Sequence, residues 1–212
     1  FVPLNVRNPN LKWETTRQLN VGLDFGLWQN RLTGTLDVYD KQTDDLLVNQ
    51  PLGPSSGFTS LLVNRGSLSN KGIELTLSGT LVDKNDFSID IGGNIAFNKS
   101  KIQNLGGSPE DIYINGNIEN RVFYRGQNIS TGNYFRTPAN IFMEGEEVGL
   151  FYGFETNGIY QTEDDLAVSD TQAGDVRIVD QDGDGAITEA DRTIIGNPNP
   201  DFVFGGYVNM NY

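Results

Sequence analysis

The 212-residue sequence contains no histidine and no cysteine. Their absence excludes Ser-His-Asp triads, Cys-His nucleophiles, thiolate zinc sites and disulfide bonds. Basic residues are also few: 15 Lys and Arg stand against 28 Asp and Glu, which gives a net charge of −13. Because phosphate recognition requires clustered Lys and Arg, this balance argues against nucleic-acid binding. We therefore expect no enzymatic activity, and cations or neutral polar molecules are the more suitable ligands.

Long apolar runs are missing as well. No stretch approaches the roughly 18 to 20 consecutive apolar residues of a transmembrane helix. Only 37% of the residues are hydrophobic, which is low for a soluble globular domain. The sequence starts at Phe1 with neither an initiator Met nor a signal peptide, and it stops at Tyr212 inside an alternating run. We expect it to be a section of a longer polypeptide.

The dominant pattern is a period-two alternation of apolar and polar residues. In the first run, Leu19, Val21 and Leu23 alternate with polar or small residues, as in a strand with one apolar face. Runs of this kind predict five antiparallel strands, over residues 19–27, 31–39, 72–81, 87–97 and 202–212. Short turns at 29–30 and 83–85 join two pairs of them into hairpins. Helical periodicity is nearly absent, so the predicted fold class is all-β.

Two architectures fit this alternation, a soluble β-sandwich and a transmembrane β-barrel. The runs are close in length to the about 9 to 11 residues with which a tilted strand crosses a bilayer core. The polar face carries four carboxylates, which suit a watery lumen: Asp24, Asp37, Glu74 and Asp90. Four apolar residues separate the two architectures: Leu23, Leu36, Leu75 and Ile91. A sandwich would bury them under a second sheet, whereas in a barrel they would face lipid.

Five strands cannot close a barrel, for which about eight is the practical minimum, so the barrel would be partial. Outer-membrane barrels have short periplasmic turns and long extracellular loops. On this basis residues 1–103 form barrel strands and hairpins, residues 104–200 form a long extracellular loop region, and residues 201–212 start the next barrel strand. The aromatic segment 148–160 is a candidate strand within the loop region.

One motif carries chemistry, the segment DQDGDGAITEAD at residues 180–191. It has carboxylates at positions 1, 3, 5 and 12 and glycine at position 6, as in a twelve-residue calcium loop. The predicted ligands are the carboxylates of Asp180, Asp182, Asp184 and Asp191 and the backbone carbonyl of Ala186. Residues 175–179 look like a strand, so this is not a helix-loop-helix EF-hand. We expect a structural Ca²⁺ here; the alternative is a tight turn held by bonds from side chains to the backbone.

Two other acidic clusters are less specific. Residues 144–147 contain three glutamates, and residues 163–165 read Glu-Asp-Asp. Such clusters are compatible with a second cation site, with a glycosidase carboxylate pair or with solvated loop charge, and the last of these is the most common.

Three segments resemble a single family: NPNLKWETTRQLNVGLDF (8–25), VNRGSLSNKGIELTLSG (63–79) and DVRIVDQDGDGAITEADRTIIGNPNP (175–200). They are similar to the C-terminal barrel portion of the SusC/RagA-type TonB-dependent outer-membrane transporters of Bacteroidetes. The resemblance implies a transmembrane barrel of about 22 strands with an N-terminal plug, embedded in outer-membrane lipid. It also implies import of an oligosaccharide or peptide substrate. The implied partners are a SusD-like surface lipoprotein and TonB, which a region N-terminal to this sequence would contact.

Two alternatives remain open from the sequence. The chain could be a soluble, secreted binding module or adhesin whose β-sheet is braced by calcium. It could also be a barrel component recruited to a protein-secretion complex. The exposure of the apolar stripe separates the first alternative from a barrel.

Overall fold

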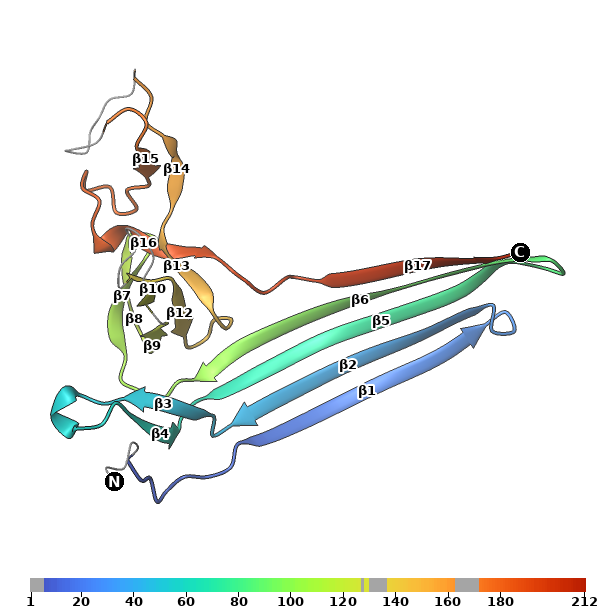
Figure 1. Cartoon of the computed structure of the whole chain (residues 1–212), viewed down its shortest axis with the longest axis horizontal. Coiled ribbons are helices and arrows are strands. Elements are labelled where there is room, and N and C mark those ends of the chain that lie inside the picture. Colours follow the sequence, from blue (N-terminus) through green and yellow to red (C-terminus); the bar gives the residue numbers. More distant parts are fainter. Residues whose placement is uncertain (1–5, 127, 130–136, 163–171) are drawn as a thin grey trace. The chain divides into compact units, whose positions relative to one another are not determined.

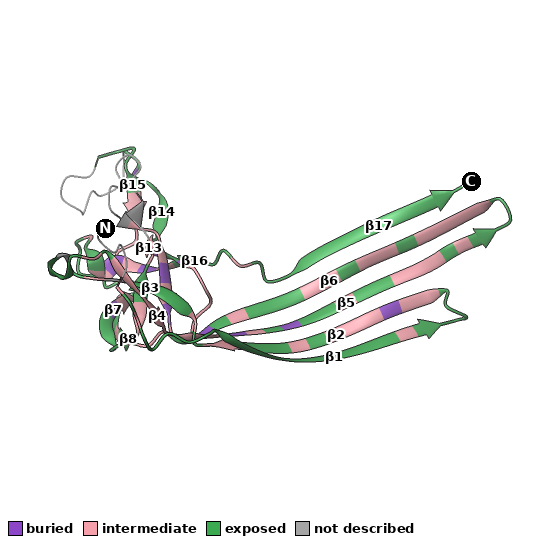
Figure 2. Ribbon diagram, turned by 60° about the horizontal axis from the view of Figure 1, so that its bottom comes forward, coloured by how far each residue is buried: buried purple, intermediate pink, exposed green. Residues whose placement is uncertain are grey.

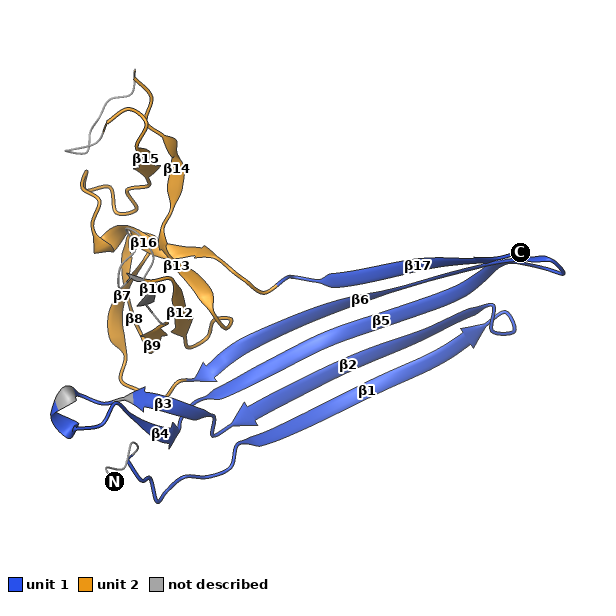
Figure 3. Cartoon of the chain, in the orientation of Figure 1, with its two compact units in different colours: residues 1–104, 200–212 blue, residues 105–199 orange. Residues whose placement is uncertain are grey.

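The computed structural model describes residues 6–126, 128–129, 137–162 and 172–212. The chain forms two compact units, coloured separately in Figure 3: residues 1–104 together with 200–212, and residues 105–199. The sequence pattern predicts boundaries between regions after residues 103 and 200, close to those of the two units. Within the described ranges, no helix has both the length and the apolar character needed to cross a membrane.

The first unit is built on one five-stranded antiparallel sheet, in the order β1-β2-β5-β6-β17 (Figure 1). Its strands are β1 (Thr15–Leu27), β2 (Leu32–Asp44), β5 (Ser67–Lys84), β6 (Phe87–Asn104) and β17 (Val203–Asn211). Each overlaps one of the five strands that the alternation predicted. The predicted all-β, antiparallel fold class is confirmed.

Several strands continue beyond the alternating runs, into mainly polar segments in which the paired Leu68 and Ile102 are exceptions and Ile102 is buried. There the register is supported by ion pairs between neighbouring strands. Arg17 on β1 lies 2.8 Å from Asp44 on β2, and Lys71 on β5 lies 2.8 Å from Asp40 on β2. Because apolar residues are too few in these extensions to repeat every second position, hydrophobic alternation gives no signal for them.

One face of the long sheet is apolar in every strand. The register aligns one residue from each strand in a continuous apolar row: Leu23, Leu36, Leu75, Ile95 and Phe204. Leu23 is 59% exposed and Ile91 is 37% exposed. Leu36 and Leu75, which lie opposite each other, are half-buried. Figure 2 shows the same mixture of exposed and half-buried residues along the long strands. None of the four diagnostic residues is buried, which favours the barrel over a sandwich.

Tight turns and long connections alternate along the sheet. Residues 28–31 join β1 to β2, and Trp28, Gln29 and Asn30 have positive φ (51°, 57° and 66°). Residues 85–86 join β5 to β6. The connection from β2 to β5 contains a hairpin with a short 3₁₀ turn: β3 (Leu47–Pro51), η1 (Pro54–Ser56) and β4 (Ser60–Asn64). The connection from β6 to β17 contains the whole second unit.

The second unit consists of short strands. They are β7 (Glu110–Ile114), β8 (Asn117–Arg121), β9 (Phe123–Arg125), β10 (Asn128–Ile129), β11 (Thr137–Pro138), β12 (Asn140–Met143), β13 (Leu150–Phe154), β14 (Thr156–Ile159), β15 (Val176–Ile178) and β16 (Arg192–Gly196), with the 3₁₀ turn η2 (Glu189–Asp191). Four of them form a sheet in the order β16-β13-β12-β9, and the others pair as β7-β8, β10-β11 and β14-β15.

A small apolar core holds this unit together. Its buried members are Ile112, Ile141, Met143, Leu150 and Tyr152. The aromatic segment 148–160 contributes two strands to the unit, β13 in the four-stranded sheet and β14 in a separate pair. Its aromatic side chain Tyr152 therefore packs inside the unit, with its hydroxyl donating to the backbone carbonyl of Tyr113 at 2.9 Å.

Candidate functional site

The loop predicted to bind calcium, residues 180–191, follows β15 and ends with η2 in the second unit. The structure brings three of its carboxylates together: Asp180, Asp182 and Asp184 each offer an oxygen within 4.8 Å of the others. Asp180 is half-buried, and the other two side chains are exposed. Alternate residues of the tight loop thus converge on one point, as the spacing predicted for these three residues.

Backbone amides hold these carboxylates in place. Asp180 accepts hydrogen bonds from the amides of Gly183 (2.7 Å) and Gly185 (2.8 Å), one on each carboxylate oxygen. Asp182 accepts from the amide of Asp184 at 3.1 Å, and Asp184 accepts from that of Ala186 at 2.7 Å. Gly183 and Gly185 have φ of 76° and 85°, in the left-handed region where a side chain would be strained. The loop is therefore a preformed turn whose carboxylate oxygens keep further lone pairs for a cation.

Asp191, the predicted ligand at position 12, occupies a different environment. It is completely buried, and it is not among the carboxylates whose oxygens lie within 4.8 Å of one another. One oxygen accepts from the amide of Gln181 at 2.8 Å, and the other accepts from that of Thr188 at 2.7 Å. Thr188 in turn caps η2 by accepting from the amide of Ala190. Asp191 therefore ties the start of the loop to its end.

Electrostatics within the loop are uneven. Hydrogen bonds from the backbone amides of Gly185 and Gly183 hold the pKa of Asp180 below its usual range, although desolvation opposes this. The amide of Asp184 acts in the same direction on Asp182. There it is outweighed by desolvation and by the neighbouring charges of Asp184 and Asp191, so the pKa of Asp182 is raised. A raised pKa beside other carboxylates indicates repulsion that a bound cation would relieve.

A β-turn packs against the loop from the β7-β8 hairpin. Asn115 and Gly116 form this two-residue turn, with φ of 50° and 71°. Gly116 lies so close to the backbone carbonyl of Gln181 that a Cβ would overlap it. Thr193 fixes the other side of the turn, donating its hydroxyl to the Asn115 side chain at 2.6 Å. The Asn-Gly pair is a sequence signal for a hairpin. Spacing within the calcium motif gives no indication that this hairpin turn supports the loop.

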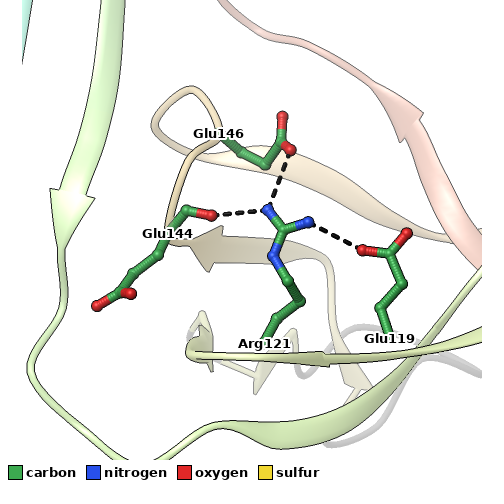
Figure 4. A network of polar contacts seen from close by, with 4 residues as sticks. All are labelled: Glu119, Arg121, Glu144 and Glu146. Carbon is green, nitrogen blue, oxygen red and sulfur yellow. Dashed lines mark hydrogen bonds and ion pairs between the residues drawn. The ribbon is translucent and has the colours of Figure 1, made fainter.

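The acidic cluster 144–147 is organised around Arg121 (Figure 4). The Arg121 guanidinium donates to the carboxylates of Glu119 (2.9 Å) and Glu146 (3.3 Å) and to the backbone carbonyl of Glu144 (2.7 Å). Glu147 accepts from the side-chain amide of Asn197 at 2.8 Å. These contacts give the cluster a structural role. The cluster 163–165 lies outside the described residues.

The polar face of the long sheet is the second candidate site. Asp24 accepts from the Thr35 hydroxyl, and Asp90 accepts from that of Thr80, each at 2.7 Å and each across one strand pair. The other two carboxylates of this face, Asp37 and Glu74, lie directly opposite each other in the register of β2 and β5. The face therefore combines fixed carboxylates and hydroxyls, which suits contact with water or polar solutes.

Comparison with known proteins places this architecture in a family. Residues 1–207 match the family model described as TonB dependent receptor-like, beta-barrel. TonB-dependent receptor P3 of Formosa agariphila is 37% identical over 210 residues, and TonB-dependent receptor SusC of Bacteroides thetaiotaomicron is 32% identical over 209 residues. Each alignment covers 97% of this chain, but only 20% and 19% of the two relatives.

Solved structures of the RagAB system show the same fold. The RagAB peptide transporter matches with a TM-score of 0.68 at 23% identity, over 98% of this chain and 20% of that chain. The RagAB peptide importer in the closed-closed state matches with a TM-score of 0.65 at 25% identity, over 97% of this chain and 20% of that chain. The named relatives are receptors and transporters, which supports a non-enzymatic role at the level of the family. The chain belongs to the TonB-dependent receptor β-barrel family, as a section of a SusC/RagA-type barrel protein of the outer membrane.

Proposed function

We propose that the full-length protein is a TonB-dependent importer of oligosaccharides or peptides, in which this chain forms part of the barrel wall and catalyses no reaction. The observation that carries the proposal is the two-faced sheet, apolar on one side and lined by fixed carboxylates and hydroxyls on the other. Import is supported by the relatives: one is SusC, and RagAB is a peptide importer. The chain spans only about 20% of their length, so the activity belongs to the whole protein.

The proposal includes two protein partners. A SusD-like surface lipoprotein would act on the extracellular side, to which we assign the second unit because it forms the long connection between β6 and β17. TonB would act through a region N-terminal to this sequence. Both partners are supported by the SusC and RagAB relatives.

We also propose that the loop 180–191 binds a structural Ca²⁺ through Asp180, Asp182 and Asp184, with the Ala186 carbonyl and Asp191 as further ligands. Support comes from the donor set, because three convergent carboxylates are the hard oxygen ligands that Ca²⁺ prefers. The cation would brace the second unit. We expect no catalysis there, since a loop that fills the coordination sphere with protein oxygens leaves no position for substrate.

The test of import is an uptake assay with the full-length protein in its native outer membrane. Cells would receive fluorescent oligosaccharides and fluorescent peptides in parallel, with and without collapse of the proton gradient. The proposal expects one of the two classes to enter only in energised cells, and a gene deletion to abolish that entry. A surface lipoprotein should co-purify with the barrel in mild detergent.

Two results would contradict the proposal. Uptake of neither class, together with normal surface display of the protein, would exclude an importer for these substrates. Co-purification with secretion machinery, and loss of secreted proteins on deletion, would instead establish the role in a protein-secretion complex.

A further inference from the structure

The apolar face of the long sheet contains a groove of about 850 Å³. It runs over β2, β5 and β6, close to the tight turns, and its walls are aliphatic: Leu32, Leu75, Leu77, Leu81, Ile91 and Ile95. Trp28, the first residue of the β1-β2 turn, stands at its rim and is 73% exposed.

Glycines in the apolar rows create the groove. The register aligns Gly79 with Leu32 on one side and Ile91 on the other, so a side chain is missing in the middle of an apolar row. A Cβ at Gly79 would have 3.4 Å to the nearest atom, the carbonyl oxygen of Arg31, which is ordinary contact distance. The nearest side-chain atom is Cδ1 of Leu32 on β2, 3.6 Å from that Cβ position, so Leu32 forms one wall of the gap at Gly79. By contrast, a Cβ at Gly93 would approach the Gly205 carbonyl to 2.9 Å, so Gly93 is required by the backbone.

The surroundings determine what can occupy the groove. Its lining is mostly apolar, with a smaller polar part from Arg31, Ser78, Thr80 and Asn94, so an apolar occupant is favoured over water. The groove is continuous with the apolar surface that faces lipid in an outer-membrane barrel. The tight-turn end of such a barrel is periplasmic, and an exposed Trp at the end of a strand is typical of the membrane interface. The lipid beside this end is the phospholipid of the periplasmic leaflet.

We propose that the groove is a binding site for one acyl chain of a periplasmic-leaflet phospholipid. The Gly79 gap admits the chain against the backbone of β5, and the aliphatic walls hold it more closely than a flush surface holds bulk lipid. Each methylene of the acyl chain that packs against these walls gains dispersion contacts, which strengthens retention of the lipid. The inference depends on the outer-membrane location of the barrel and not on its cargo.

Native mass spectrometry of the full-length protein, extracted from outer membranes in mild detergent, tests the site. We expect the wild type to retain one phospholipid, and Gly79→Leu, which fills the groove, to lose it. Gly79→Ala adds only one methyl group and should retain an intermediate fraction. Val21→Leu is the control, because Val21 lies on the same apolar face, is 64% exposed, and neither it nor its register partner Val38 lines the groove. Heat-modifiable migration in gels verifies that each variant has folded.

Several outcomes would overturn the proposal. If the folded wild type carries no phospholipid, the groove does not hold a lipid through extraction. Equal retention by folded Gly79→Leu excludes this groove as the site, and equal loss in Val21→Leu indicates nonspecific lipid contact. An adduct with the mass of lipopolysaccharide in place of phospholipid contradicts the leaflet assignment. Failure of substrate uptake would not affect any of these readouts.

Discussion

The ring of Tyr207 on β17 lies directly across Gly92, its register partner on β6. The hydroxyl reaches beyond this glycine to the side chain of Ser78 on β5, at 3.2 Å. Tyr39 crosses Gly72 in the same way and donates to Asn98 at 3.2 Å. Each tyrosine thus links three strands on the polar face, and each glycine provides the space for an aromatic ring. An aromatic ring that covers a cross-strand glycine compensates for the side-chain contacts that the glycine lacks.

The first prediction concerns this packing. Gly92→Val would place its side chain where the Tyr207 ring lies, so the ring must move away and lose its contact with Ser78. We expect the free energy of unfolding to fall by about 1 to 3 kcal/mol, as for other overpacked sites. Denaturant unfolding of the full-length protein in detergent micelles measures this.

Two variants make that measurement specific. Gly206→Val adds the same side chain where the nearest atom is 3.6 Å away, and should cost much less. Tyr207→Phe keeps the ring and removes only the hydroxyl, with an expected loss of about 1 kcal/mol or less. Equal losses for Gly92→Val and Gly206→Val would contradict the packing argument.

The long sheet could be predicted from sequence because its alternation is repeated in every strand. Glycines inside the apolar runs were harder to interpret. Gly34, for example, is buried because the ring of Phe25 covers it, and only the register reveals that contact. The short strands of the second unit were mostly missed, since strands of two to five residues are too short to establish a period. The positions of these short strands depend on a small shared core and on paired turns, which are properties of tertiary packing.

The second prediction concerns the proposed cation loop. Adding Ca²⁺ to metal-free, full-length protein should raise its thermal stability, and Asp182→Asn should abolish this increase. In chelator, Asp182→Asn should not destabilise the protein, because the substitution removes a charge that its neighbours repel. Asp201→Asn changes an exposed carboxylate outside the loop and serves as the control. Thermal denaturation followed by circular dichroism suffices, and an unchanged Ca²⁺ response in Asp182→Asn would exclude the site.

The third prediction is the pH dependence of this response. Carboxylates bind Ca²⁺ only when deprotonated, so protons and the cation compete. Because the pKa of Asp182 is raised, Asp182 takes up a proton before Asp180 does as the pH falls. Calcium affinity should therefore be constant near neutral pH and fall on acidification, beginning above the ordinary pKa of an aspartate. Calcium titrations by calorimetry at several pH values test this, and an affinity that does not weaken in acid would contradict carboxylate coordination.

The fourth prediction concerns the guanidinium of Arg121. Its three acceptors come from β8 and from the segment after β12, and a planar fork can serve them together. Arg121→Lys keeps the charge but offers a single nitrogen, so at least one acceptor loses its partner, at about 1 kcal/mol. Hydrogen exchange of the amides in 117–121 and 140–146 should accelerate. Arg17→Lys is the control, because Arg17 forms an exposed ion pair with Asp44 and its substitution should change hydrogen exchange little. Equal acceleration in the two variants would show that the Arg121 network does not stabilise the second unit.

The candidate cation site was partly readable from sequence. Spacing alone placed Asp180, Asp182 and Asp184 together, since that follows from local loop geometry. The environment of Asp191 was not predictable, because its burial and its bonds to two amides depend on how the loop closes. The support from the β7-β8 turn was also missed, since Gly116 and Gln181 are far apart in the sequence and touch only in the folded unit.

The last prediction tests that support. Gly116→Ala combines two costs: a side chain at φ 71°, and an overlap of its Cβ with the Gln181 carbonyl. Gly158→Ala has only the first, because Gly158 has φ 79° and open space around its Cβ position. We expect Gly158→Ala to cost about 1 to 2 kcal/mol and Gly116→Ala to cost clearly more, since the overlap adds strain of about 1 to 3 kcal/mol.

Gly116→Ala should also weaken the response to Ca²⁺, because relief of the overlap displaces residue 181 within the loop, whereas Gly158→Ala should leave the response intact. Equal stabilities and equal Ca²⁺ responses of the two variants would mean that the hairpin turn does not support the loop.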